Sequence, residues 1–279
     1  MAKIIGGIGT SHVPSVGVVF DQGRTDEPDW KPLFDAYKPV QEWLKEMKVD
    51  VAVVIYNDHG GDFFFDKYPT FAVGASEEYQ LADEGFGIRP LPVIKGHSRF
   101  SWHLCEQLVY NEFDITVCQE LKVEHGFLVP MHLCFDPVPD WSVKAVPIQV
   151  NVIQHPLPTA LRCYKFGQQI KNAISSWEED LNVVILGTGG MSHQLSGERF
   201  GYINSDFDSW WLDKIEKEPE TLLSITHQEI MEKAGVEAVE LIMWLVMRGA
   251  LSDRVERIHR NYYAPMTTGM GLLALGNLT

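Results

Sequence analysis

The sequence predicts an α/β fold: one domain over residues 1–279, with a central, mostly parallel or mixed sheet flanked by helices and an active site at the strand carboxyl ends. Apolar segments rich in β-branched residues, such as 51–55, are typical of strands buried on both faces. They alternate along the chain with amphipathic segments of helical period, which is the α/β pattern. No internal repeat or low-complexity linker divides the 279 residues, so we expect one large core.

The first elements follow from hydrophobic periodicity. Residues 3–8 form an expected strand, and residues 15–30 are expected to form a polar loop because little periodicity is visible. Residues 30–47 place their apolar side chains on one stripe, which predicts a helix before the central strand 51–55. At 63–65, three phenylalanines could line a pocket for a flat ligand, but we expect at least two of the rings in the core.

The middle of the chain contains one long connection. Residues 76–92 are rich in glycine, proline and acidic residues, and we expect a surface loop; loops of this length are often functional. A helix over 98–110, a strand over 115–118 and a short helix over 127–135, interrupted or started by Pro130, follow.

The second half continues the alternation. Residues 143–153 form an apolar strand in which Pro147 indicates an edge or a bulge. The remaining expected elements are a helix over 158–177, a strand over 182–186, helices over 207–215, 218–225 and 235–247, and a turn with a final apolar segment within 257–279.

Composition excludes some classes of function. The formal net charge of −15 argues against nucleic-acid binding, which needs a basic surface. No apolar run approaches the roughly 20 residues that span a bilayer. The glycine-rich N-terminus is too short for a signal peptide, so a cytoplasmic location is expected. Free, buried thiols of a cytosolic protein best explain the four cysteines, which lack CxxC spacing: Cys105, Cys118, Cys134 and Cys163.

Three histidines occupy equivalent positions. His12, His59 and His193 each follow an expected strand through a glycine-containing turn. One such residue would be most simply a turn histidine, but ligands in open α/β sheets bind beyond the strand carboxyl ends, and three together suggest a common rim. His125, after an expected strand and before Gly126, is a candidate fourth member. We assign the remaining histidines to structure or surface: His97, His103, His132, His155, His227 and His259.

Glu240 lies in a segment that is apolar on nearly every side of a helix. A buried carboxylate there costs several kcal/mol unless it is paired or binds a metal. The spacing equally allows a pair with Arg248 or Arg254, or an exposed stripe shared with Glu237.

Two imidazoles and one carboxylate form the facial triad of non-haem Fe(II) oxygenases, which leaves positions open for substrate and dioxygen. A zinc site with two histidines and one glutamate has the same sequence pattern. Further histidines near such a site suit acid–base chemistry near neutral pH. Residues 187–190 are glycine-rich, but no lysine follows in P-loop spacing, so phosphate binding is a weak alternative.

Five segments, in this order and spacing, resemble the type II (LigB-like) extradiol ring-cleavage dioxygenases, above all the catalytic β subunits of the protocatechuate 4,5-dioxygenase type. The similarity runs from about residue 4 to about residue 270. A sixth segment, Val239-Glu240-Leu241 with the MWLVMRGAL run over 243–251, completes the match. The five are Gly9–Pro14, Tyr56–His59, Asp83–Gly87, Glu124–Gly126 and Gly187–Gln194.

The resemblance implies a site and a reaction. His12, His59 and Glu240 fall at the Fe(II)-ligand positions, His193 at the acid–base position, and His125 at that of a second histidine that steers or hydrogen-bonds the substrate. The implied reaction opens the ring of a catecholic aromatic acid with O₂ in aromatic catabolism.

The match departs from the family after Pro265. Protocatechuate enzymes have Ser-Asn-Thr there, which helps to hold the ring carboxylate, whereas this chain has Met266 followed by Thr267 and Thr268. We expect these two threonines to contact substrate. Because of the departure, the identity of the substrate stays open between protocatechuate, gallate and another substituted catechol.

Two further questions stay open at this point. The small helical α subunit of such enzymes is expected as a separate chain or absent, with a homo-oligomer or an α/β hetero-oligomer as the assembly. A zinc hydrolase and a non-catalytic metal-binding relative are the competing functions; retention of all five site residues argues against the second.

Overall fold

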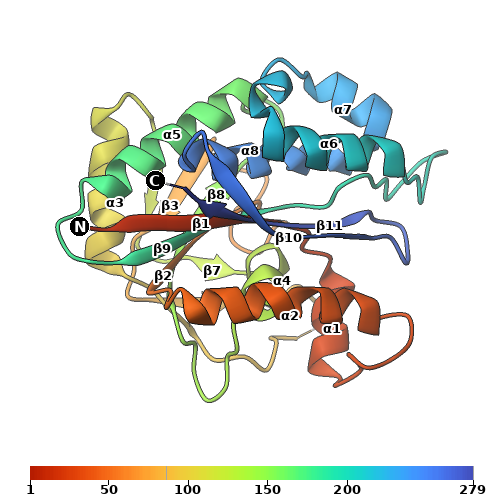
Figure 1. Ribbon diagram of the computed structural model, residues 1–279, viewed down its shortest axis with the longest axis horizontal. Coiled ribbons are helices and arrows are strands. Elements are labelled where there is room, and N and C mark those ends of the chain that lie inside the picture. Colours follow the sequence, from red (N-terminus) through yellow and green to blue (C-terminus); the bar gives the residue numbers. More distant parts are fainter. Residues whose placement is uncertain (86, 279) are drawn as a thin grey trace.

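The computed structural model describes residues 1–85 and 87–278; Phe86, within the 83–87 segment of the resemblance, and Thr279 lie outside the described residues. The main sheet has eight strands, in the spatial order β10-β11-β1-β9-β2-β8-β3-β6 (Figure 1). Their bounds are β1 (Lys3–Thr10), β2 (Val51–Tyr56), β3 (Phe71–Gly74), β6 (Thr116–Cys118), β8 (Lys144–Val150), β9 (Asn182–Thr188), β10 (Val255–Tyr263) and β11 (Met270–Asn277). A smaller sheet consists of β4 (Glu78–Leu81), β5 (Ile94–Lys95) and β7 (Lys122–Val123).

The sheet is mixed, and its centre is parallel. Strands β1, β9, β2 and β8 run in one direction, whereas β11 and β3 join this block antiparallel. Thr10 pairs with Thr188, and Ile55 pairs with Gly187, so β1, β9 and β2 end at the same level. The predicted α/β class, with a mixed sheet and helices on its faces, is confirmed.

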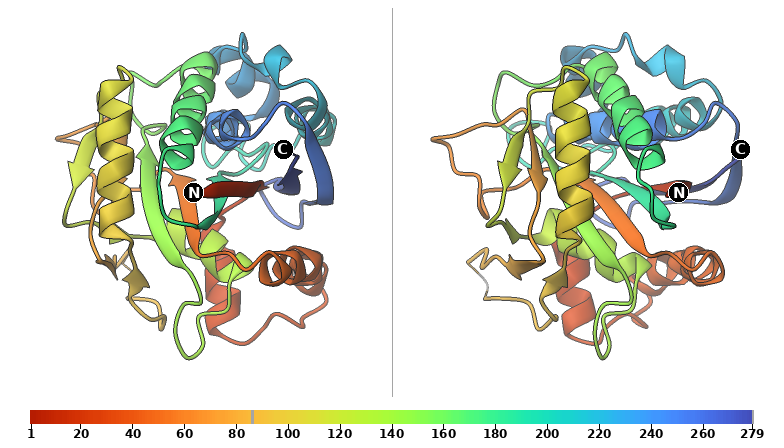
Figure 2. Two further views of the ribbon diagram at one scale, coloured as in Figure 1. Left: turned by 60° about the vertical axis from the view of Figure 1, so that its left-hand side comes forward. Right: turned by 90° about the vertical axis from the view of Figure 1, so that its left-hand side faces the viewer.

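Helices cover both faces of this sheet (Figures 1 and 2). Helices α1, α2 and α4 lie on one face, and α3, α5, α6, α7 and α8 lie on the other. Their bounds are α1 (Pro14–Asp21), α2 (Lys31–Glu46), α3 (Ser98–Tyr110), α4 (His125–Cys134), α5 (Ala160–Ser175), α6 (Ser205–Lys217), α7 (His227–Ala234) and α8 (Ile242–Ala250), with 3₁₀ turns η1 (Pro219–Leu222) and η2 (Glu237–Leu241).

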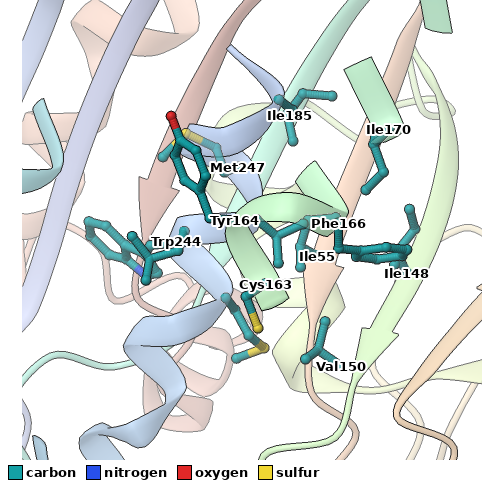
Figure 3. Packing of buried hydrophobic residues seen from close by; sticks show 14 of the residues in the cluster. Ile55, Ile148, Val150, Cys163, Tyr164, Phe166, Ile170, Ile185, Trp244 and Met247 are labelled. Carbon is teal, nitrogen blue, oxygen red and sulfur yellow. The ribbon is translucent and has the colours of Figure 1, made fainter. Parts of the chain in front are cut away.

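The two faces bury two hydrophobic clusters. Along β2, Val53 and Ile55 belong to the cluster under α5 and α8, and Val54 and Tyr56 belong to the one under α2 and α4. This is the period of two expected of a strand with both faces covered. Figure 3 shows side chains of α5 and α8 over the sheet, among them Phe166, Ile170, Trp244 and Met247 near Ile55, Ile148 and Ile185.

The prediction of a polar loop over 15–30 was partly wrong, because α1 occupies the first part of that range. Pro14 stands at the start of α1, where a missing N–H costs nothing, and Val16 and Val19 are buried. A helix of only two turns that is rich in valine and glycine is too short to show a clear helical period. The prediction of a surface loop over 76–92 was wrong for the start of that range, because β4 lies there.

The prediction for the phenylalanines was wrong. Phe64 and Phe65 are 60% and 69% exposed, and Phe63 is half-buried. Their segment leaves the sheet because the Asp58 carboxylate accepts hydrogen bonds from the N–H groups of Gly60, Asp62 and Phe63. That turn closes directly after β2 and holds the rings beyond the strand end.

Pro147 lies neither on an edge strand nor at a bulge, contrary to the expectation. Strand β8 pairs with β2 over 144–149 and with β3 only over 148–150. The proline is tolerated inside the sheet because the β3 ladder ends one residue away from it.

The C-terminal third also differs in detail. The helix expected over 235–247 is the turn η2 followed by α8, and the one expected over 218–225 is the short turn η1. The final segment is a hairpin of β10 and β11, so 257–263 is strand as well. The four cysteines are free thiols, as expected; Cys118 is half-buried and the others are buried. Among the helices within residues 1–85 and 87–278, none is both long and apolar enough to cross a membrane.

Candidate active site

The predicted histidines meet beyond the carboxyl ends of three parallel strands. His12 follows β1, His59 follows β2 and His193 follows β9. The rings of His12 and His59 are 5.2 Å apart and perpendicular, and those of His59 and His125 stack at 4.1 Å. The common rim expected from the sequence is therefore present.

Glu240 brings a carboxylate to the same rim. It is 5% exposed, and its Oε2 lies 3.3 Å from His12 Nε2 while its Oε1 lies 3.4 Å from His59 Nε2. The three ion-pair partners of Glu240 in the described chain are histidines. Arg248 instead donates to backbone carbonyls of residues 215, 252 and 253, so the arginine-pair and exposed-stripe alternatives for Glu240 are wrong.

The glycine turn after β9 fixes Glu240 in place. The Gly190 N–H donates to Glu240 Oε2 at 2.8 Å. Gly189 has φ +131°, and a Cβ there would lie 2.7 Å from the Glu240 Cβ, so only glycine suits this approach. The glycines of 187–190 thus pack a carboxylate against the strand end.

In two of the histidines, a hydrogen-bonding partner at Nδ1 sets the orientation of the ring. Thr188 Oγ1 lies 3.0 Å from His12 Nδ1, and His12 Nε2 is a buried nitrogen for which the described residues offer no hydrogen bond. His193 donates its Nδ1–H to the Met191 carbonyl at 2.8 Å, which leaves its Nε2 facing Glu240 at 3.9 Å. Both rings therefore present Nε2 to the cluster.

His125 is the first residue of α4, and carboxylates surround it. Its Nδ1 lies 2.6 Å from Glu124 Oε2 and also contacts the Glu84 carboxylate. The same Glu124 oxygen lies 3.1 Å from His59 Nδ1. Sequence reasoning did not single out Glu84 and Glu124, although both stand in segments that carried the resemblance; for Glu124, the available signal was its position directly before His125.

The charges of the cluster are strongly coupled. Burial opposes protonation of His59, but Glu124 and Glu240 outweigh it and raise the pKa of His59 to about 10. For His12, burial prevails over the attraction of Glu240 and lowers the pKa. Burial disfavours the charge of Glu240, but the histidines around it, His12 above all, hold the pKa of that carboxyl well below its usual range.

These residues fit a divalent metal ion. Ligand atoms of His12, His59 and His125 all lie within 4.8 Å of one another, and the Glu240 oxygens face two of these rings. The buried Nε2 of His12 forms no hydrogen bond with the described residues although Glu240 Oε2 lies 3.3 Å away, as expected of two atoms that can share a metal ion. Imidazole and carboxylate ligands suit both Fe(II) and Zn(II).

A cavity of about 740 Å³ opens beside the rings. Its lining includes Pro14, Val18, His59, Glu84, Arg89 and His125. A second cavity of about 700 Å³ lies between α2, the end of α4 and residues 135–143. None of the four clustered histidines lines that second cavity in the described chain, so the first cavity is the one that fits a substrate.

The two threonines expected to contact substrate lie beside His193. Thr268 is buried and forms an isolated antiparallel bridge with His193, and Thr267 is half-buried next to it. Their contact with a substrate stays a prediction.

Comparisons with known proteins agree with this geometry. The chain is 44% identical over 197 residues to a protein of Pseudomonas putida named gallate dioxygenase, covering 71% of this chain and 58% of the relative. It is 28% identical over 184 residues to a 2,3-dihydroxyphenylpropionate/2,3-dihydroxicinnamic acid 1,2-dioxygenase of Photorhabdus laumondii, covering 66% of this chain and 54% of the relative. The chain thus spans about half the length of the curated relatives it matches.

A solved structure shows the same fold. An uncharacterized protein of Escherichia coli K12 superposes with a TM-score of 0.56 over 96% of this chain and 99% of its own, at 12% identity. The family described as the catalytic LigB subunit of aromatic ring-opening dioxygenase matches residues 6–273. With the strand-end histidines and Glu240 inside that range, this chain belongs to the LigB family.

Proposed function

We propose that this chain is a non-haem Fe(II)-dependent extradiol dioxygenase, which cleaves the ring of a catecholic aromatic acid with O₂. The proposed catalytic domain covers residues 1–279, and His12, His59 and Glu240 are its metal ligands. The observation that carries the proposal is the Glu240 carboxylate, whose two oxygens lie 3.3 and 3.4 Å from the Nε2 atoms of two histidines that follow different strands.

Bound Fe(II) would supply Lewis acidity and a template for the two hydroxyl oxygens and O₂. The chain supplies the proton transfers. His193 Nε2 is the proposed acid–base atom, because its Nδ1–H is committed to the Met191 carbonyl and its other nitrogen is free to accept a hydroxyl proton. His125, on the cavity wall, is the proposed second catalytic histidine, which hydrogen-bonds the substrate.

The relative named gallate dioxygenase favours a hydroxylated benzoate as the substrate. Thr267 and Thr268 offer hydroxyls near His193, where a ring carboxylate would need donors. A homo-oligomer, or a complex with a small helical α subunit, stays a prediction.

The test is anaerobic loading with Fe(II), followed by air and, in separate samples, gallate, protocatechuate and a catechol without a carboxylate. We expect O₂ uptake equal to substrate loss, with a yellow ring-opened product from one of the two acids. The Zn(II)-loaded protein and samples kept without O₂ are the controls. Substrate loss in either control would favour a hydrolase, and no O₂ uptake with any of the three compounds would refute the proposal.

A further inference from the structure

Glu124 occupies an unusual position between two histidines of the site. It is 0% exposed and precedes α4 as its N-cap, where its Oε1 accepts the Gly126 N–H at 2.9 Å. Its Oε2 lies 3.1 Å from His59 Nδ1 and 2.6 Å from His125 Nδ1. Both carboxylate oxygens therefore have N–H groups directed at them.

We propose that Glu124 is a positioning residue that keeps the proton of His59 and of His125 on Nδ1. A carboxylate is acceptor-only, so each ring that bonds to it must present an N–H. The opposite nitrogen, Nε2, is then the atom that a metal ion can use as a ligand, in place of any proton shared there with Glu240. This inference rests on the proposed metal centre, because it explains why His59 Nε2 is available as a ligand.

The geometry around the two rings supports this role. His59 Nε2, opposite the Glu124 contact, lies 3.4 Å from Glu240 Oε1. The His59 and His125 rings stack at 4.1 Å with an interplanar angle of 28°, so one carboxylate oxygen can serve both. Metal-binding histidines are commonly oriented by such an acceptor on the other nitrogen.

The surroundings leave Glu124 no alternative arrangement. A Cβ at Gly126 would lie 2.6 Å from Glu124 Oε1, 2.7 Å from the Asn57 carbonyl oxygen and 3.3 Å from His59 Cε1. Glycine at 126 therefore permits the carboxylate to fold back over the start of α4. With its oxygens held by Gly126 on one side and two rings on the other, the carboxylate cannot turn without losing a bond.

The substitution Glu124→Gln tests this directly, since it keeps the shape and replaces one acceptor oxygen by an NH₂ donor. If the amide oxygen stays on the Gly126 N–H, the NH₂ group faces both Nδ1 atoms and favours the other tautomer of His59, which has no second carboxylate at Nδ1 among the described residues. Glu84→Gln is the matched control, because Glu84 contacts His125 but forms no hydrogen bond or ion pair with His59 among the described residues.

The probe is Zn(II), which is diamagnetic, measured by calorimetry and by ¹H–¹⁵N spectra of histidine-labelled protein. We expect Zn(II) affinity to fall 10- to 100-fold in E124Q, the scale of lost outer-shell support, and about threefold or less in E84Q. In the Zn(II)-loaded wild type, His59 and His125 should both show an Nδ1–H signal; E124Q should lose that of His59, whereas His125 still has the Glu84 carboxylate as an acceptor, and E84Q should retain that of His59.

The outcomes separate the two proposals. Wild-type protein that binds no Zn(II) would refute the metal centre itself. Wild type and E124Q with equal affinity and equal spectra would refute the role of Glu124 alone. If E124Q does not fold, the spectrum of the Zn(II)-loaded wild type still decides: a ring of His59 or His125 without a proton on Nδ1 overturns the inference.

Discussion

The strand-end histidines and His132 of α4 lie in environments of opposite charge. His59 faces Glu124 and Glu240, and these carboxylates raise its pKa to about 10 against the effect of burial. His132 stacks on Phe20 at 3.9 Å, and Arg89 Nη2 donates to its Nδ1 at 3.2 Å. Burial and the Arg89 charge lower the pKa of His132 to about 4.

The two charge environments indicate a functional role for the strand-end histidines and a structural role for His132. Carboxylates gathered around imidazoles attract a cation, and the ring nitrogens facing Glu240 can serve as its ligands. At His132, a neutral ring accepts a hydrogen bond from a guanidinium that is itself held by both oxygens of Asp21 at 2.8 Å. We therefore expect substitutions in the first group to abolish metal binding or turnover, and those in the second to change stability.

The largest effect is expected from Glu240→Gln. The amide can still accept the Gly190 N–H, so the fold should persist, but an uncharged side chain no longer attracts a cation. Because loss of outer-shell support alone costs 10- to 100-fold, we expect loss of a ligand to reduce Fe(II) affinity by more than about 100-fold. Anaerobic Fe(II) titration and thermal unfolding measure the two quantities; unchanged Fe(II) affinity would break the comparison.

The next effect is expected from His193→Ala, which removes the proposed acid–base atom but none of the proposed ligands. Turnover should fall by about 10² to 10⁴, while bound iron stays equimolar with protein. Single-turnover kinetics with metal analysis of the same sample checks both. Turnover within a few-fold of wild type would remove His193 from this role.

The smallest effect is expected from His132→Leu, and it depends on pH. In wild type the folded pKa of about 4 lies below the unfolded value near 6.5, so the unfolded chain binds the additional proton between these values. The stability of wild type is therefore fully present above pH 6.5 and declines as pH falls toward 4. Since the ring is only partly buried, we discount the full linkage value and expect about 1–2 kcal/mol.

The leucine variant should lack this part of the decline, so its stability should fall less between pH 6.5 and 4. Urea unfolding at several pH values, with activity measured alongside at pH 7, tests this. Equal slopes in both proteins would show that His132 titrates normally, and a large loss of turnover would contradict its assignment to structure.

Much of the fold followed from local pattern. The strands over 51–55 and 182–186 and the helix over 98–110 were predicted because burial on both faces, or on one stripe, leaves a clear period in the sequence. Helix α1 and the exposure of Phe64 and Phe65 were missed. Two turns of helix carry too little period, and the turn around Asp58 depends on side-chain hydrogen bonds that composition does not show.

The sequence alone determined that three histidines would meet at one sheet edge, because strands of one direction end at the same side. It could not decide what Glu240 faces: an arginine eight residues on and two histidines about 180 or more residues away were equally allowed by spacing. Only the tertiary structure selected the histidines, by packing η2 against the glycine turn after β9. The same holds for Glu124, whose partner His59 is distant in sequence and adjacent only after β2 and α4 have packed together.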